Sequence, residues 1–183
     1  MNESWFEQLA VQACNSTKNI PKRFPPSPYY KFLELLAQNI KPRISVELGV
    51  CGGGGSYSLA MGHPLGRVIG IDVVNDYPDN IEFIKKKCPN FEFHIGDSVR
   101  FPSYDNLTNC PTVDILFIDT THTYDQTRKE YWAWEKYLSP NSVVCLDDLK
   151  RKEMGTIWED LPGRKIRLDI LHNTDEGGFG VIF

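Results

Sequence analysis

The chain has 183 residues and a formal net charge of −4, and 41% of its residues are hydrophobic and 24% charged. This length and composition predict a single globular domain over residues 1–183. The negative charge and the lack of a basic run argue against a nucleic-acid partner. No apolar stretch of the sequence approaches the ~18–20 residues that span a bilayer, which argues against a membrane partner.

The cysteine pattern and the start of the chain predict the compartment. Five cysteines at wide spacings contain no Cys-x-x-Cys pair, which favours free thiols over a zinc site. Free thiols are typical of a reducing cytoplasm. The first residues lack the basic start and apolar core of a signal peptide, so we expect a cytoplasmic protein.

The first 42 residues predict a helical and proline-rich cover segment. Residues 3–14 have the pattern of a short amphipathic helix, and apolar residues at helical spacing predict another over residues 29–39. Between them, residues 19–28 contain four prolines, so this stretch is expected to be extended or turning.

From residue 43 onward, short apolar runs alternate with helical patterns. The runs are of the kind buried on both faces of a sheet, and they predict strands at residues 44–49, 68–73, 91–95, 113–119 and 143–147. Helices are expected at 56–61 with Ser56 near its start, at 79–87 with Asp79 as a cap, and at 124–138, ended by Ser139-Pro140-Asn141. The alternation predicts an α/β fold with helices on both faces of a parallel sheet.

The last part of the chain predicts one more helix and a hairpin. The helix is expected at residues 151–161, closed by Pro162-Gly163. Residues 166–171 and 179–183 predict two strands joined by residues 173–178, close enough in sequence to pair with each other.

A glycine-dense turn follows the first strand, which carries Glu47 near its end. Four consecutive glycines, residues 52–55, lose much backbone entropy on folding and so favour a turn that a ligand approaches closely over a plain strand-to-helix turn. Asp72 ends the second strand, where a carboxylate can accept both hydroxyls of a ribose. Together the turn and Asp72 predict a cofactor that contains a nucleoside.

Acidic residues stand at the ends of all five predicted parallel strands, at Glu47, Asp72, Asp97, Asp119 and Asp147-Asp148. Because these ends share one edge of the sheet, they predict a shared site. Asp97 and Ser98 can accept the exocyclic amine of an adenine, or they can cap a short helix near residues 98–101.

Asp119, Asp147 and Asp148 follow two strands that we expect to be neighbours. Three carboxylates close together repel unless a cation neutralises them, and oxygen ligands suit Mg²⁺, Mn²⁺ or Ca²⁺. In the alternative interpretation one acid faces the cofactor, while the others cap the helix near Lys150 or pair with Arg151.

His122 and Tyr124 follow Asp119 and can transfer a proton, His122 near neutral pH. The alternative is that His122 is a solvated loop residue. Four other reactive side chains are interpreted as structural or packing residues: His63, His94, His172 and Cys51.

These motifs resemble class I S-adenosylmethionine-dependent methyltransferases, on residues 46–49 with the glycine run, 70–72, 96–98 and 113–119. Residues 118–124 and 138–148 are similar to a branch of small O-methyltransferases and macrolide-sugar methyltransferases. The usual pattern there is Ile-Asp-Gly-x-His-x-Tyr, Leu-x-Pro-Gly-Gly, then a strand ending in His-Asp or Asp-Asp. The resemblance covers about residues 43–183, with Cys51 and Thr120 in place of the usual small residues.

The resemblance implies a Rossmann-like three-layer sandwich with a seven-stranded, mostly parallel sheet and an antiparallel last strand. It implies S-adenosylmethionine as cofactor, on Glu47, Gly49, Gly52, Gly53, Ser56, Asp72, Asp97, Ser98 and Asp119. In metal-dependent members, acids matching Asp119, Asp147 and Asp148 hold a divalent cation, here Mg²⁺ or another hard ion. That cation orients the acceptor hydroxyl and lowers its pKa.

The leading hypothesis is methyl transfer to a small-molecule hydroxyl, such as one on a sugar, with Asp119 or His122 as the base. An NAD-dependent oxidoreductase shares the ribose acid and the glycines, but Cys51 breaks its Gly-x-Gly-x-x-Gly pattern. A third hypothesis is a non-catalytic subunit with a cofactor fold. Because the first 42 residues supply little substrate cover, a partner or a second copy in a homo-oligomer is expected to complete the site.

Overall fold

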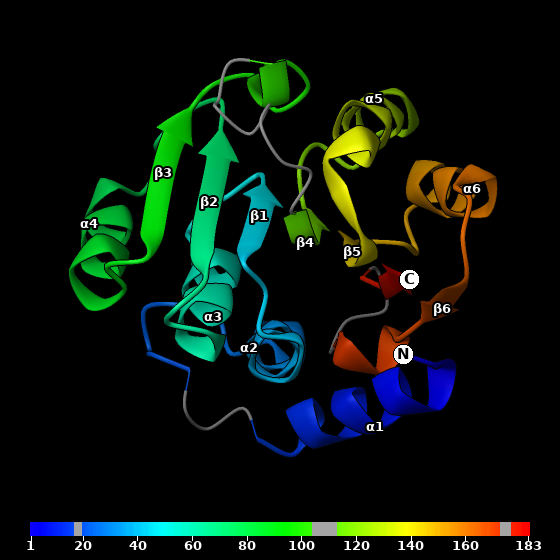
Figure 1. Cartoon of the computed structure of the whole chain (residues 1–183), viewed down its shortest axis with the longest axis horizontal. Coiled ribbons are helices and arrows are strands. Elements are labelled where there is room, and N and C mark those ends of the chain that lie inside the picture. Colours follow the sequence, from blue (N-terminus) through cyan, green and yellow to red (C-terminus); the bar gives the residue numbers. More distant parts are fainter. Residues whose placement is uncertain (17–19, 104–112, 173–176) are drawn as a thin grey trace.

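A seven-stranded sheet of order β3-β2-β1-β4-β5-β7-β6 forms the centre of the protein, seen in a computed structural model that describes residues 1–16, 20–103, 113–172 and 177–183 (Figure 1). Strands β1 to β5 pair in parallel, and β7 is antiparallel to both β5 and β6. This confirms the expected mostly parallel sheet with an antiparallel last strand. The strands are β1 Ile44–Leu48, β2 Arg67–Asp72, β3 Phe91–Ile95, β4 Val113–Ile118, β5 Leu138–Asp147, β6 Lys165–Arg167 and β7 Phe179–Ile182.

Helices cover both faces of this sheet, so the fold has three layers. One apolar core lies between the sheet and the helices α1 to α4, and a second lies between the sheet and α5 and α6 (Figure 1). Alternate residues of a strand serve different cores, as Phe117 does in the first core and Leu116 in the second. The helices are α1 Glu3–Cys14, α2 Pro28–Ile40, α3 Gly54–Gly62, α4 Pro78–Lys87, α5 Tyr124–Trp134 and α6 Lys152–Asp160.

The two N-terminal helices lie where the sequence predicts them. The Asn2 side chain caps α1 by accepting a hydrogen bond of 3.0 Å from the Trp5 backbone. Pro28 opens α2, a position where its missing N–H costs nothing, and Lys41 ends it in the left-handed conformation.

Two helix starts differ from the predictions. Helix α3 begins at Gly54 instead of near Ser56, because Gly53 precedes it with a φ of 83°, a conformation that glycine adopts freely. Helix α4 takes Tyr77 as its N-cap and Pro78 as its first residue, so Asp79 lies in the first turn and is not the cap. In both cases a residue with restricted or unusual backbone geometry sets the boundary.

The C-terminal third shows a longer β5 and a shorter β6 than the sequence predicts. Helix α5 ends at Trp134, a 3-10 turn over Glu135–Tyr137 follows, and β5 starts directly at Leu138. Residues 139–141 are therefore strand and not a helix-ending turn, and the Ser139 hydroxyl donates to Asp114 Oδ1 at 2.7 Å. Strand β6 stops at Arg167, and a 3-10 turn over Asp169–Leu171 leads toward β7.

The remaining expectations concern thiols and the membrane. Four cysteines are free thiols, and Cys110 and the hairpin residues 173–176 lie outside the described residues. Of these four, Cys51 is exposed, so it is not the buried packing residue that the sequence suggests. Within the described ranges, no helix combines the length and the apolar character needed to cross a bilayer.

Candidate active site

The sheet brings the predicted strand-end acids to one edge. Strand β1 pairs with β2 and β4, and β4 pairs with β5, so Glu47, Asp72, Asp119 and Asp147 end adjacent strands. Two backbone hydrogen bonds of 2.9 Å fix this edge, from the Gly49 N–H to Ile71 and from the Asp119 N–H to Leu48. Three neighbouring strand ends therefore form one rigid rim.

The glycine turn after β1 is dense because the chain packs tightly around it. Gly49 has a φ of 83°, and a Cβ there would collide with the carbonyl oxygen of Asp119. A Cβ at Gly54 would overlap the Tyr30 ring, and one at Gly55 would overlap the Glu47 carboxylate. At Gly52 the nearest atom would be Asn80 Nδ2, 3.7 Å away. Most of these glycines are thus needed by the fold itself, while a Cβ at Gly52 would make only an ordinary contact with Asn80.

Glu47 lies under this turn with only 1% of its surface exposed. The Ser56 hydroxyl donates to its carboxylate. Burial raises the pKa of Glu47 to about 8, although the Ser56 hydrogen bond works against this shift. The charge of nearby Asp119 raises it further, so at neutral pH the side chain is largely protonated.

Asp72 joins the end of β2 to the glycine turn. Its carboxylate accepts from the backbone N–H of Cys51 at 2.8 Å and from that of Val74 at 3.5 Å. Cys51 is held here in the left-handed conformation, with a φ of 46°. The backbone at this corner is therefore ordered by the same carboxylate that is predicted to bind a ribose.

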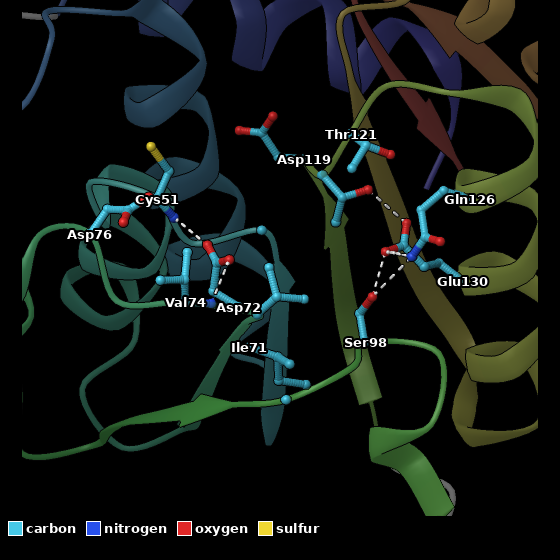
Figure 2. Close-up of a pocket in the computed structure, with 14 residues that line it drawn as sticks. Cys51, Ile71, Asp72, Val74, Asp76, Ser98, Asp119, Thr121, Gln126 and Glu130 are labelled. Carbon is cyan, nitrogen blue, oxygen red and sulfur yellow. Dashed lines mark hydrogen bonds between the residues drawn. The ribbon is translucent and has the colours of Figure 1, made fainter.

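A first cavity of about 280 Å³ opens beside Asp72 (Figure 2). Asp72 and Val74 lie on one wall, and Ser98, Gln126 and Glu130 lie on the opposite wall. The lining also includes Gly49, Cys51, Ile71, Val73, Asp76, Gly96, Asp119, Thr120 and Thr121. Apolar surface with a few fixed polar groups is typical of a small-ligand site.

Glu130, on α5, organises the second wall and was not identified from the sequence. It is fully buried and accepts from Ser98 Oγ at 2.5 Å, Thr120 Oγ1 at 2.9 Å and Gln126 Nε2 at 2.9 Å (Figure 2). Burial raises its pKa, against the effect of these three donors. A mid-helix acid has no distinctive sequence signal, because its partners come from three other positions in the chain.

Asp97 has a different environment from Ser98. Its exposed carboxylate accepts from the Val99 backbone at 2.9 Å and lies 3.5 Å from Arg100. Ser98 is buried and lines the first cavity, and Gly96 lines it as well. The Asp97 carboxylate thus serves the capping role that the sequence left open, and its contact with a cofactor stays a prediction.

The other acids meet two histidines in an acid–histidine cluster of Asp119, His122, Asp147, Asp148 and His172. His122 Nε2 lies 3.0 Å from Asp119 Oδ1 and 3.6 Å from Asp148 Oδ2. His172 Nε2 lies 2.5 Å from Asp147 Oδ1, and Arg151 lies 2.7 Å from Asp148. His172 is therefore part of the site, although its sequence context suggested a structural residue.

Charge and burial oppose each other in this cluster. Burial raises the pKa of Asp119 to about 6, the His122 hydrogen bond lowers it, and the charges of Asp147 and Asp148 raise it. Burial lowers the pKa of each histidine, but the acid that bonds it outweighs burial, so the pKa values of His122 and His172 are raised. The acids thus favour the charged form of both histidines, while burial favours the neutral form of Asp119.

The backbone of this region is also strained. His122 has a φ of 56° and Asp148 a φ of 57°, both in the left-handed region that side chains disfavour. Such conformations cost on the order of 1–3 kcal/mol each and tend to cluster at functional sites. Here the two strained residues meet each other, with His122 Nε2 3.6 Å from Asp148 Oδ2.

A second cavity of about 500 Å³ lies on the other side of Asp119. Its aromatic wall comes from the N-terminal cover segment, through Phe24, Tyr29 and Tyr30. The polar floor consists of Glu47, Asp119, His122, Asp147 and Asp148, and Arg23, Pro25, Val50, Gly52, Tyr77 and Asn80 complete the lining. Cys51, Asp119 and Thr120 line both cavities, so the two meet at the end of β4.

The strand order, the glycine turn and the acids at the strand ends define a class I S-adenosylmethionine-dependent methyltransferase. The family described as "Methyltransferase domain" matches residues 46–149, more than half of the chain, and the chain belongs to this family. The match runs from within β1 to the residues just after β5. It therefore includes His122 and all the acids at the strand ends. This family match favours the methyltransferase resemblance over the oxidoreductase alternative.

Known relatives are distant. The uncharacterized protein R132 of Acanthamoeba polyphaga mimivirus is 29% identical over 114 residues, which cover 56% of this chain and 50% of that protein. The chain therefore spans about half the length of this curated relative.

Solved structures are similar over nearly the whole chain. Cofactor-bound Rv0187 from MTB has a TM-score of 0.73 at 18% identity, covering 98% of this chain and 89% of the other. The O-methyltransferase TomG from Streptomyces achromogenes, in complex with SAM, has a TM-score of 0.68 at 21% identity, covering 99% and 90%. At these identities the likeness establishes the fold.

Proposed function

We propose that the protein transfers a methyl group from S-adenosylmethionine to a hydroxyl of a small-molecule acceptor, such as a sugar, with the help of a divalent cation. The observation that carries this proposal is the meeting of the two cavities at Asp119, beside His122. A donor in one cavity and an acceptor in the other would face each other across that residue. Holding two reactants in this way supplies a large part of a displacement rate.

The first cavity fits the nucleoside part of the donor. Asp72 would accept the ribose hydroxyls, and Ser98 would lie beside the adenine on the wall braced by Glu130. The methionine part would run past Gly49 in this cavity toward Gly52 and Glu47, which line the adjoining second cavity. When bound, the donor supplies an electrophilic methyl group on a sulfonium.

His122 would act as the base. Its Nε2 donates to the Asp119 carboxylate at 3.0 Å when that carboxylate is ionised, which leaves the lone pair on Nδ1 to take a proton. Asp119 would hold this tautomer and stabilise the protonated ring. His122 lines the second cavity, where the acceptor hydroxyl would lie.

The donor set also fits a cation. Asp119 and Asp147 offer ligand atoms within 4.8 Å of each other, and so do Asp147 and Asp148, which leaves His122 free to act as the base. Burial is the main cause of the raised pKa of Asp119, and the neighbouring charges of Asp147 and Asp148 add to it. A divalent cation bound there supplies Lewis-acid polarisation that lowers the pKa of a hydroxyl.

The test is calorimetric binding of S-adenosylhomocysteine, followed by methyl transfer to a panel of sugar and catechol hydroxyls. We expect Asp72→Ala to abolish binding, while Asp125→Ala, an exposed acid on α5, leaves it unchanged. If the wild-type protein gave no binding heat at high concentration, the proposed function would be wrong.

A further inference from the structure

His172 occupies a position that the proposed reaction does not use. Its Nε2 lies 2.5 Å from Asp147 Oδ1, and the side chain is only 11% exposed. Asp147, Asp148 and His172 offer three ligand atoms that lie within 4.8 Å of one another. The imidazole therefore adds a nitrogen donor to a site whose other donors are carboxylates.

The surroundings of His172 aim this nitrogen at the acids. The ring stacks on Tyr29, with centroids 5.1 Å apart and an interplanar angle of 18°. The backbone at Gly177 packs against the Nδ1 edge so closely that a Cβ there would collide with the ring. One face and one edge of the imidazole are thus covered, and Nε2 is the nitrogen presented to Asp147.

His172 Nε2 and Asp147 Oδ1 form a short hydrogen bond. Without the proton between them, both atoms can bind a metal ion. Two ligand atoms at about 2.1 Å from a common ion, at right angles, lie about 3 Å apart. The pair would need to separate by only a few tenths of an ångström to admit a cation.

We propose that His172 is a nitrogen ligand of the cation centre, and that the centre therefore selects a later transition ion such as Co²⁺ over Mg²⁺. This inference rests on the cation site in the proposed function. Mg²⁺ prefers oxygen ligands in near-ideal octahedral geometry, whereas imidazole favours later divalent metals. One nitrogen among three carboxylates shifts the preference toward those metals.

The competing explanation is that His172 only positions Asp147 through the hydrogen bond. The two roles predict different results. Loss of a positioning residue weakens every ion to a similar extent. Loss of a nitrogen ligand weakens Co²⁺ and leaves Mg²⁺ almost unchanged, because Mg²⁺ gains little from the nitrogen.

The experiment titrates the metal-free full chain with Co²⁺ and with Mg²⁺ by calorimetry, without donor or acceptor. We expect Co²⁺ to bind about 100-fold more tightly than Mg²⁺. His172→Gln should lower Co²⁺ affinity about tenfold or more, with less than about a threefold effect on Mg²⁺. His63→Gln is the matched control and should change neither affinity. His63 follows the end of α3, away from the carboxyl ends of the strands.

A second readout starts from the wild-type chain, so its first result does not depend on how the variant folds. Pulsed electron paramagnetic resonance of the Mn²⁺-loaded wild-type chain should show coupling to a histidine nitrogen, and His172→Gln should remove it. Three results would overturn the proposal: equal affinities for Co²⁺ and Mg²⁺, equal losses for both ions in the variant, or a nitrogen coupling that survives it.

These results are separable from a failure of the proposed function. Binding of S-adenosylhomocysteine and methyl transfer in the presence of a chelator are measured on the same preparation. If binding and transfer persist without metal selectivity, only the role of His172 is wrong. If S-adenosylhomocysteine does not bind while the Co²⁺ preference stands, the donor assignment is wrong and the nitrogen ligand is supported.

Discussion

Two sets of acids face the cavities, and their surroundings differ. Glu47 and Glu130 are enclosed and receive hydroxyl or amide donors from the chain, Glu47 from Ser56 and Glu130 from three side chains. Asp119, Asp147 and Asp148 instead face one another, with imidazoles and Arg151 as partners.

The difference separates structural from reactive carboxylates. An enclosed acid whose oxygens are satisfied rigidifies its surroundings, whereas clustered acids store electrostatic repulsion that a proton or a cation relieves. The first set therefore holds the shape of the site, and the second set is where an added charge would act. Each prediction below tests one side of this contrast.

The largest effect is expected for Asp119→Asn. Methyl transfer should fall by about a thousandfold, because His122 loses the carboxylate that orients it and stabilises its charge. A steady-state assay at saturating donor measures this loss.

The same variant should be more stable than the wild type at alkaline pH. The folded-state pKa of Asp119 is raised to about 6, so the folded protein loses stability as pH rises from about 4 to 6 and does not recover it above. Asn removes this cost, and urea unfolding at pH 8 should show a gain of about 1–3 kcal/mol. A loss of stability at pH 8 would contradict the clustered-acid interpretation.

Gly49→Ala should be the most destabilising change in the glycine turn. Its φ of 83° and the collision with the Asp119 carbonyl cost about 3 kcal/mol or more of unfolding free energy, measured by chemical denaturation. Gly52→Ala is the matched control, because its Cβ would make only an ordinary van der Waals contact, and it should change stability by less than about 0.5 kcal/mol. Equal effects at both positions would show that the turn is not sterically fixed.

Glu47 predicts a pH effect on donor binding. Because the free chain keeps this carboxyl protonated at pH 7, with a pKa of about 8, a positively charged ligand group beside it should lower the pKa and release a proton. Calorimetry of S-adenosylhomocysteine in buffers of different ionisation enthalpy should detect release of about one proton at pH 7. Glu47→Gln should abolish the release, and an unchanged proton count in that variant would assign it elsewhere.

The smallest effect is expected for Glu130→Gln. An amide offers one acceptor oxygen where the carboxylate serves three donors, so at least one donor is left without a partner, at a cost of about 1–2 kcal/mol of stability. Thermal unfolding measures the change, and Lys129→Gln, the exposed neighbour on α5, should be silent. If both variants behaved alike, the wall of the first cavity would not depend on Glu130.

Much of the fold, and part of the site, could be predicted from the sequence where the signal is local. Strand β3 has the predicted bounds, and β1, β2 and β4 lie within one residue of theirs at each end, because continuous apolar runs are seldom anything but buried strands. Adjacent strand ends then follow from parallel topology, so the convergence of Glu47, Asp72 and Asp119 could be expected.

The rest depends on contacts between distant residues. The polar start of β5 resembles a turn until Ser139 is seen bonded to Asp114 on β4. His172 meets Asp147 across 25 positions only because β7 lies between β5 and β6. Tyr29 and Tyr30 have the spacing of ordinary core residues. They line a cavity because helix α2 packs against the glycine turn.

The aromatic wall of the second cavity has a consequence for how new specificities could arise. Phe24, Tyr29 and Tyr30 precede the first strand, and none of them pairs with the sheet. If this cavity takes the acceptor as proposed, exchanging that short stretch between relatives would change the molecule being modified. The donor turn is anchored in β1 and β2, and such an exchange would have to keep Tyr30, whose ring packs against Gly54 of that turn.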